Sequence, residues 1–196
     1  MTRRLGFTVR LATLAVGIVL LACMAMADQT VLAPQPGEPA VSSSGDWALA
    51  TLNFANRRMA HMLVLVNFRT NQLRHVRDYG RGADVAWSPD SERFLVNDHF
   101  ASDESDCFIY DRNTLQVTRL SPILVVALPE MKKFFQYDPN YLNCERWISN
   151  RALFVHFYGW GGDTPSGFDY VLRYDGARGF TIVSKSFKYG APYPRR

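Results

Sequence analysis

Residues 85–97 read Val-Ala-Trp-Ser-Pro-Asp-Ser-Glu-Arg-Phe-Leu-Val-Asn and predict a β-hairpin. Proline and aspartate initiate turns, whereas the apolar runs on either side favour extended chain. Residues 107–120 follow the same plan, with an Asp-Arg-Asn-Thr turn between two further strands. The two hairpins together predict four antiparallel strands.

The same plan occurs on both sides of this segment. Upstream, residues 41–51 and 64–73 take the places of the two hairpins, and residues 147–155 and 170–183 do so downstream. The upstream copy is offset by about 44 residues, a period typical of stacked supersecondary units.

The Trp87-Ser88-Pro89-Asp90 turn and the apolar strand that follows it resemble the WD-like β-propeller repeat of the TolB type. Ser91 stands where that family usually has glycine. The resemblance is strongest over residues 85–120 and implies blades of antiparallel sheet. It implies no activity, because a fold does not determine a function, although such blades commonly serve as docking scaffolds for other proteins.

We therefore predict an all-β fold with three antiparallel β-sheet blades in a propeller-like or open-arc arrangement. The repeats cover about residues 38–77, 78–121 and 144–187. Closed propellers typically have at least four blades, so three blades favour an arc. The insert at residues 122–143 is expected to hold one or two helical turns at residues 130–136, and a degenerate fourth blade within it stays open as an alternative.

The first 27 residues have the pattern of a secretory signal peptide. Arg3 and Arg4 precede an apolar run at residues 11–22, and Ala-Met-Ala precedes Asp28. Cleavage there leaves a single domain of residues 28–196 without a membrane span, in the periplasm or secreted. A Leu-Leu-Ala-Cys sequence ending at Cys23 resembles a lipobox, so a lipoprotein anchored through Cys23 is the alternative.

Charge and cysteine usage follow from that leader. Arg3, Arg4 and Arg10 supply three units of the formal net charge of +4, so the remaining chain is nearly neutral and is not expected to bind nucleic acid. In an oxidising compartment, Cys107 and Cys144 are expected to form a disulfide. Two separate buried thiols are the alternative.

The sequence shows no recognised catalytic or metal-binding constellation. Its four histidines lack the spacing of a metal-binding pair. His99 lies among acidic residues, which suggests a calcium loop or an acid-base site, but the spacing lacks the ligand alternation of an EF-hand and favours a solvated loop. We therefore expect no cofactor, no metal, and a protein that is not an enzyme.

A glycine-rich stretch at residues 158–168 is the predicted binding surface, with another protein as the partner. An aromatic anchor beside small polar residues is typical of binding hot spots. The residues expected to contact the partner are Tyr158, Trp160, Asp163, Thr164, Ser166 and Phe168. The most concrete expectation is an inhibitor or immunity protein that occludes the active site of a secreted toxin, such as a cell-wall hydrolase. A TolB-like envelope scaffold or lipoprotein and an unrecognised hydrolase are the alternatives.

Overall fold

The computed structural model describes residues 38–53, 61–128, 132, 140–160, 165–174 and 180–189. At residues 160, 165–170, 174, 180 and 187–189 it describes the backbone alone. The proposed signal peptide and the predicted helical turns at residues 130–136, except Lys132, lie outside these ranges.

Twelve strands and one helix are described. The strands are β1 (Ala40–Val41), β2 (Trp47–Asn53), β3 (His61–Asn67), β4 (Gln72–Tyr79), β5 (Ala83–Trp87), β6 (Arg93–Asp98), β7 (Glu104–Asp111), β8 (Val117–Arg119), β9 (Asn140–Ser149), β10 (Ala152–Trp160), β11 (Pro165–Tyr174) and β12 (Phe180–Tyr189); the helix is α2 (Leu120–Ala127).

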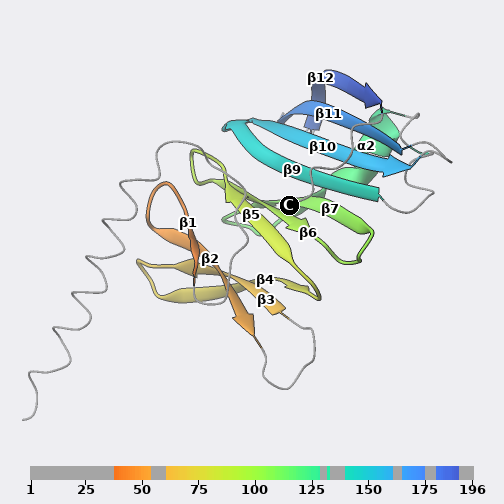
Figure 1. Ribbon diagram of the computed structural model, residues 1–196. Helices are drawn as coiled ribbons and strands as arrows, with labels where there is room; N and C mark the ends of the chain where they lie inside the picture. Colours follow the sequence, from red (N-terminus) through yellow and green to blue (C-terminus); the bar gives the residue numbers. More distant parts are fainter. Residues whose placement is uncertain are drawn as a thin grey trace, which may run out of the picture.

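The strands form three antiparallel groups of four that follow one another along the chain, as predicted. We call β1–β4 blade 1, β5–β8 blade 2 and β9–β12 blade 3. Figure 1 shows blade 2 between the other two, so the fold is all-β and propeller-like with an open-arc order of blades. Blade 3 begins at Asn140, four residues before the repeat assigned from the sequence.

Blades 2 and 3 are joined more closely than the repeat pattern predicts. A short parallel ladder pairs Glu104 and Ser105 of β7 with Asn140 and Tyr141 of β9, which makes β5–β12 one continuous sheet. From there β9 crosses blade 2. The Asn97 side-chain amide of β6 donates to the Cys144 carbonyl at 3.0 Å and accepts from the Cys144 N–H at 2.9 Å. An asparagine side chain thus pairs with β9 as a strand would.

Blade 2 is buried on both faces. Alternate residues point to opposite sides of a strand, and both sets are apolar here. Val85, Phe94, Val96, Phe108 and Tyr110 pack in the cluster shared with blade 1. On the other face, the cluster shared with blade 3 receives Ala86, Leu95, Cys107 and Ile109. This accounts for the strength of the repeat signal at residues 85–120.

A tryptophan connects each blade to the one before it. The Trp87 indole N–H donates to the Ala40 carbonyl of blade 1 at 2.8 Å, and the Trp147 indole N–H donates to the Ala86 carbonyl of blade 2 at 3.3 Å. Ala40 and Ala86 hold equivalent places, each two residues before the serine that opens a turn. In blade 3, Leu153 pairs with Trp147 and Ala152 with Ser149, so Ile148 forms a bulge. This bulge gives Trp147 the place in blade 3 that Trp87 has in blade 2.

The turns of blades 1 and 2 also repeat in their backbone geometry. Gly45 has φ +75° and Ser91, its counterpart, has φ +59°. Glycine is the residue that adopts this region without strain. Ser91 adopts it as well, so the turn in blade 2 has the same backbone conformation without a glycine. In the second turns, the side chains of Asn67 and Asp111 each accept two backbone N–H bonds from residues two and three further on.

The predicted disulfide is confirmed. Cys107 of β7 and Cys144 of β9 are bonded, with their Cα atoms 5.9 Å apart. Both residues are fully buried in the cluster between blades 2 and 3. The bond therefore fixes blade 3 to the blade 2 face that it covers.

Helix α2, which was not predicted from the sequence, directly follows β8 at Leu120. Its N-terminal residue Arg119 makes no side-chain capping bond. Instead the buried Asp106 carboxylate accepts bonds from the Ser121 N–H and hydroxyl and pairs with Arg119. A carboxylate from β7 thus replaces the local cap that marks a helix start in sequence. Within the described part of the chain, no helix has the length and apolar character needed to cross a membrane.

We predict that Trp87→Ala lowers the free energy of unfolding by about 3–5 kcal/mol, because a buried tryptophan is removed from the core. Trp87→Phe keeps most of the volume but leaves the Ala40 carbonyl without its donor, and should cost about 1–3 kcal/mol. Urea unfolding measures both changes. The control is Trp47→Ala, where the tryptophan is only half-buried; equal losses at positions 47 and 87 would contradict this assignment.

Candidate functional site

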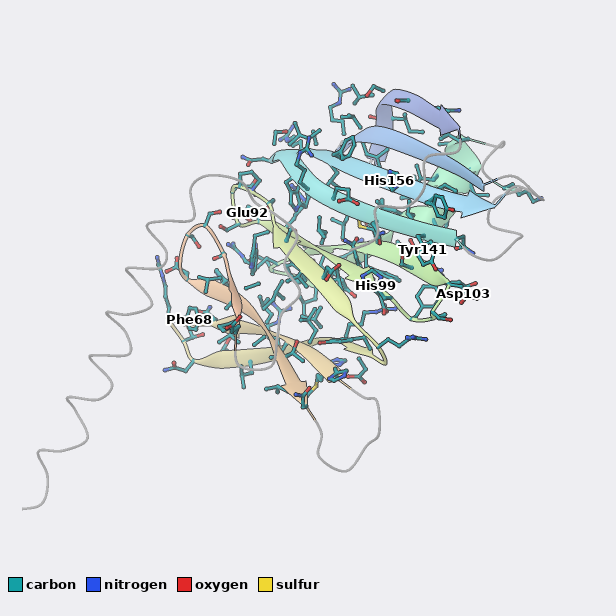
Figure 2. All side chains as sticks on the ribbon, in the orientation of Figure 1. Phe68, Glu92, His99, Asp103, Tyr141 and His156 are labelled. Atoms are coloured by element: carbon teal, nitrogen blue, oxygen red, sulfur yellow. A yellow bond between two sulfur atoms is a disulfide. The ribbon has the colours of Figure 1, made fainter. Side chains whose placement is uncertain are left out.

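The two ends of the blades differ in character. The hairpin turns after β1, β3, β5 and β7 lie at one end, which we call the turn end. The segments that link successive hairpins, such as residues 80–82 and 99–103, lie at the other, the connection end. Figure 2 shows Phe68 and Glu92 at the turn end and His99, Asp103 and Tyr141 on the opposite side of the molecule. Half-buried ionisable side chains gather at the connection end.

The most chemically suggestive of these is a histidine–aspartate pair. His99 Nε2 lies 3.1 Å from Asp84 Oδ2, and the side chains are 34% and 11% exposed. The His99 backbone N–H donates to the Gly82 carbonyl at 3.0 Å, which fixes the start of the loop. An ionised carboxylate only accepts hydrogen bonds, so the neutral imidazole must carry its proton on Nε2. Nδ1 then holds the lone pair that can take up a proton.

A second pair crosses from blade 1 to blade 2. Arg77 Nε donates to Asp98 Oδ2 at 2.6 Å, and the guanidinium lies 3.9 Å from the centre of the Phe108 ring. The Asp98 side chain is 3% exposed, and its buried Oδ1 has no hydrogen-bond partner among the residues that the structure describes. Burial lowers the pKa of Arg77, but its contact with Asp98 outweighs this and raises the pKa overall. Arg77 therefore stays charged in neutral solution.

Two tyrosines flank this pair. Burial raises the pKa of Tyr79, and the negative charge of Asp98 raises it further. A hydrogen bond at 2.8 Å between the Tyr79 and Thr51 hydroxyl groups opposes this rise. Burial also raises the pKa of Tyr110, whose contact with Arg77 opposes the rise. The ring of His61 stacks on Tyr79 with centroids 5.2 Å apart. These contacts make the Arg77–Asp98 region a structural seam between blades.

Two of the acidic side chains near His99 have structural roles. Asp98 pairs with Arg77, and Asp106 caps α2. Among the residues that the structure describes, no group of three or more His, Cys, Asp or Glu side chains is arranged to hold a metal ion.

The side-chain partner of His99 is Asp84, which was not predicted from the sequence. The signal was present, since Asp84 is the one charged residue in the otherwise apolar Ala-Asp-Val-Ala-Trp strand at residues 83–87. It pairs in register with Asn97, two residues before His99.

The predicted binding loop at residues 158–168 is mostly β-hairpin. Strand β10 continues to Trp160 and β11 begins at Pro165, with Tyr158 paired to Gly167 and Phe157 to Phe168. Tyr158 stacks on Tyr141 with centroids 6.3 Å apart. Asp163 and Thr164 lie outside the described residues, as do the side chains of Trp160, Ser166 and Phe168. Contact of these six residues with a partner therefore stays a prediction.

Comparison with known proteins gives a fold and no family. The sequence matches no protein-family model and no curated protein. The fold is similar to that of an acylaminoacyl peptidase from Pyrococcus horikoshii, with a TM-score of 0.50 and 10% identity over 82% of this chain and 25% of that one. A prolyl endopeptidase gives a TM-score of 0.45 and 17% identity over 80% of this chain and 22% of that one.

This chain thus spans about a quarter of the acylaminoacyl peptidase, and the similarity runs through the propeller domain. It supports the propeller-like fold. The prediction of an immunity protein that inhibits a secreted toxin is wrong, because the fold is similar to that of a peptidase, which fits the hydrolase alternative better.

We predict that stability falls above about pH 10, the usual pKa of tyrosine. Tyr79 and Tyr110 have raised pKa values in the folded chain, so the unfolded chain loses their protons first as the pH rises. Their stabilising contribution is complete below the unfolded value and is lost as the pH passes through the folded one. Urea midpoints from pH 8 to pH 11 measure this. Tyr110→Phe should flatten the decline, and an unchanged slope would contradict the assignment.

Proposed function

We propose that this chain is a hydrolase that acts on peptides, with His99 and Asp84 as its acid-base pair. The observation that carries the proposal is the 3.1 Å contact between His99 Nε2 and Asp84 Oδ2 at the connection end, where the imidazole is half-exposed. The fold similarity to a peptidase supports the substrate class. Histidine is the side chain that most often transfers protons near neutral pH.

The chemistry needs a water molecule as nucleophile. His99 Nδ1 removes a proton from water while the oxygen attacks the peptide carbonyl carbon. Asp84 stabilises the imidazolium that forms. The imidazolium then returns the proton to the leaving nitrogen as the carbon–nitrogen bond breaks, which yields an acid and an amine and restores the neutral ring. The His99 side chain is 34% exposed, so water can reach the ring.

The test measures incorporation of ¹⁸O from labelled water into a mixture of peptides incubated with the exported protein. We expect hydrolysis by the native chain and a loss of about 100-fold or more in His99→Ala, the range typical of a removed general base. Asp84→Asn should lose activity as well.

His75→Ala is the matched control. His75 Nε2 also contacts an aspartate, Asp78 Oδ1 at 3.0 Å, but both side chains are more than half exposed. This variant should keep full activity. Absence of turnover by the native chain, or equal activity of the His99 and His75 variants, would overturn the proposal.

An envelope scaffold of the TolB-like kind is the second candidate function. The Trp87-Ser88-Pro89-Asp90 turn favours it: the Ser88 hydroxyl donates to Asp90 Oδ1 at 2.6 Å and thereby closes the turn on which the resemblance rests. In that case the connection end would bind without catalysis, and native protein would leave all peptides uncleaved.

We propose export for either function, since the disulfide suits an oxidising compartment. The intact mass of the exported protein is expected to correspond to a chain that begins at Asp28. A lipid-modified chain that begins at Cys23 would contradict this and favour the scaffold.

A further inference from the structure

The loop that follows His99 is held by strand β9 of blade 3. The Tyr141 hydroxyl of β9 donates a hydrogen bond to the Ser102 carbonyl at 2.9 Å. The backbone N–H of Asn140 donates a second one to the Asp103 carbonyl at 2.8 Å. Figure 2 shows His99, Asp103 and Tyr141 on the same side of the molecule. Blade 3 therefore supports the segment that begins with the proposed base.

The chain before His99 meets the same strand through a row of side chains across blade 2. Asp84 of β5 pairs with Asn97 of β6, and Asn97 pairs with Cys107 of β7. Residues paired in this way point to one face of a sheet, with Cβ atoms about 5 Å apart. Cys144 of β9 lies over this row, because it is bonded to Cys107 and its backbone makes two hydrogen bonds with the Asn97 amide. The partner of His99 thus belongs to the row on which blade 3 docks.

This row is nearly closed to solvent. Asn97 is 2% exposed and Asp84 is 8% exposed. Side chains in a close-packed interior keep their rotamers, because neighbouring atoms leave no room for others. Displacement of Cys144 would remove the atoms that pack over Asn97 and would open space beside Asp84. The position of β9 therefore bears directly on the contact between Asp84 and His99.

The disulfide is the covalent tie between β9 and this row. The parallel ladder that joins β7 to β9 has two residue pairs among the described residues. Strand pairings of so few residues are marginal in water on their own. The bond between Cys107 and Cys144 therefore carries much of the attachment of β9 to blade 2.

We propose that the Cys107–Cys144 bond positions the His99–Asp84 pair, so that oxidation of the two thiols completes the site. The bond holds Cys144 over Asn97, and β9 in turn holds the loop that follows His99. The consequence for activity rests on the proposed function, because the pair acts as acid and base only if the chain is a hydrolase. Hydrolysis then begins once the chain has reached an oxidising compartment.

The oxidant that this step needs is a low-molecular-weight disulfide. One cysteine thiolate attacks a sulfur of the oxidant, forms a mixed disulfide and releases one thiolate. The second cysteine thiolate attacks the protein sulfur of the mixed disulfide and releases the other. The two released thiolates carry away two electrons and take up the two protons that the cysteines lost.

The test compares the native chain with the double variant Cys107→Ser/Cys144→Ser, which cannot form the bond. The first readout is exchange of the His99 Nε2 proton with water, followed by NMR and assigned by its loss in His99→Ala. Hydrogen exchange reports local opening, and we expect it to be at least about tenfold faster in the double variant. Peptide hydrolysis should fall by about 100-fold, a typical result of a misplaced catalytic group.

Leu65→Ala is the matched control. Leu65 is fully buried between blades 1 and 2, so this variant loses stability without a change in β9. It should keep the native exchange rate at His99 at temperatures where it is folded. Equal acceleration in Leu65→Ala would overturn the proposal, because exchange would then report a general loss of stability. An unchanged exchange rate in the double-serine variant would also overturn it.

Tyr141→Phe is the second variant in case the double-serine chain does not fold. It removes the hydroxyl that bonds to the Ser102 carbonyl and keeps the ring that stacks on Tyr158. Exchange at His99 should then be about two- to tenfold faster, the range that corresponds to one lost hydrogen bond. Exchange at the native rate in Tyr141→Phe would in that case overturn the proposal.

The two readouts separate this inference from the proposed function. Faster exchange in the double-serine variant, without peptide hydrolysis by the native chain, would refute the hydrolase and support positioning by the bond. Hydrolysis by the native chain, with exchange and activity unchanged in the double-serine variant, would refute the positioning and support the hydrolase.

Discussion

The structure depends on a hydrogen bond that is repeated from blade to blade. Each of two indole N–H groups, from Trp87 and Trp147, ends on the carbonyl of an alanine in the preceding blade. An indole is rigid and has a single donor. This contact therefore constrains both the distance between two blades and their relative position along the strand direction. Alanine at the acceptor position lets the ring approach the backbone.

Burial of blade 2 on both sides follows from this spacing. The aromatic side chains of Trp87, Phe94 and Tyr110 fill one seam, with ring centroids about 5 Å apart in successive pairs. The other seam is lined mainly by aliphatic side chains, and it contains the disulfide and the Asn97 contact. Two unlike seams therefore hold the same repeated sheet, one through aromatic packing and the other through covalent and backbone-like bonds.

The sequence predicted those features that depend on local pattern. The three four-stranded blades and the turn at Ser88–Asp90 follow from alternation and turn chemistry. The pairing of Cys107 with Cys144 follows from the even number of cysteines that remain after the predicted leader. The misses depend on contacts distant in sequence. Helix α2 begins where Asp106 of another strand supplies the cap, and His99 acquires its partner only because β5 and β6 pair in register. The glycines at residues 158–168 predict a loop, because glycine favours turns. In the structure, β10 extends to Trp160 and β11 begins at Pro165, so most of this stretch is strand.

The position of the disulfide constrains when it can form. Cys107 and Cys144 have no exposed surface once blade 3 lies on blade 2, and thiol–disulfide exchange requires that a reagent reach a sulfur atom. An oxidant must therefore act while blade 3 is still partly undocked. After docking, the same packing shields the bond from reductants. The bond thus forms during folding, before the seam between blades 2 and 3 closes, and its reduction requires local opening of that seam.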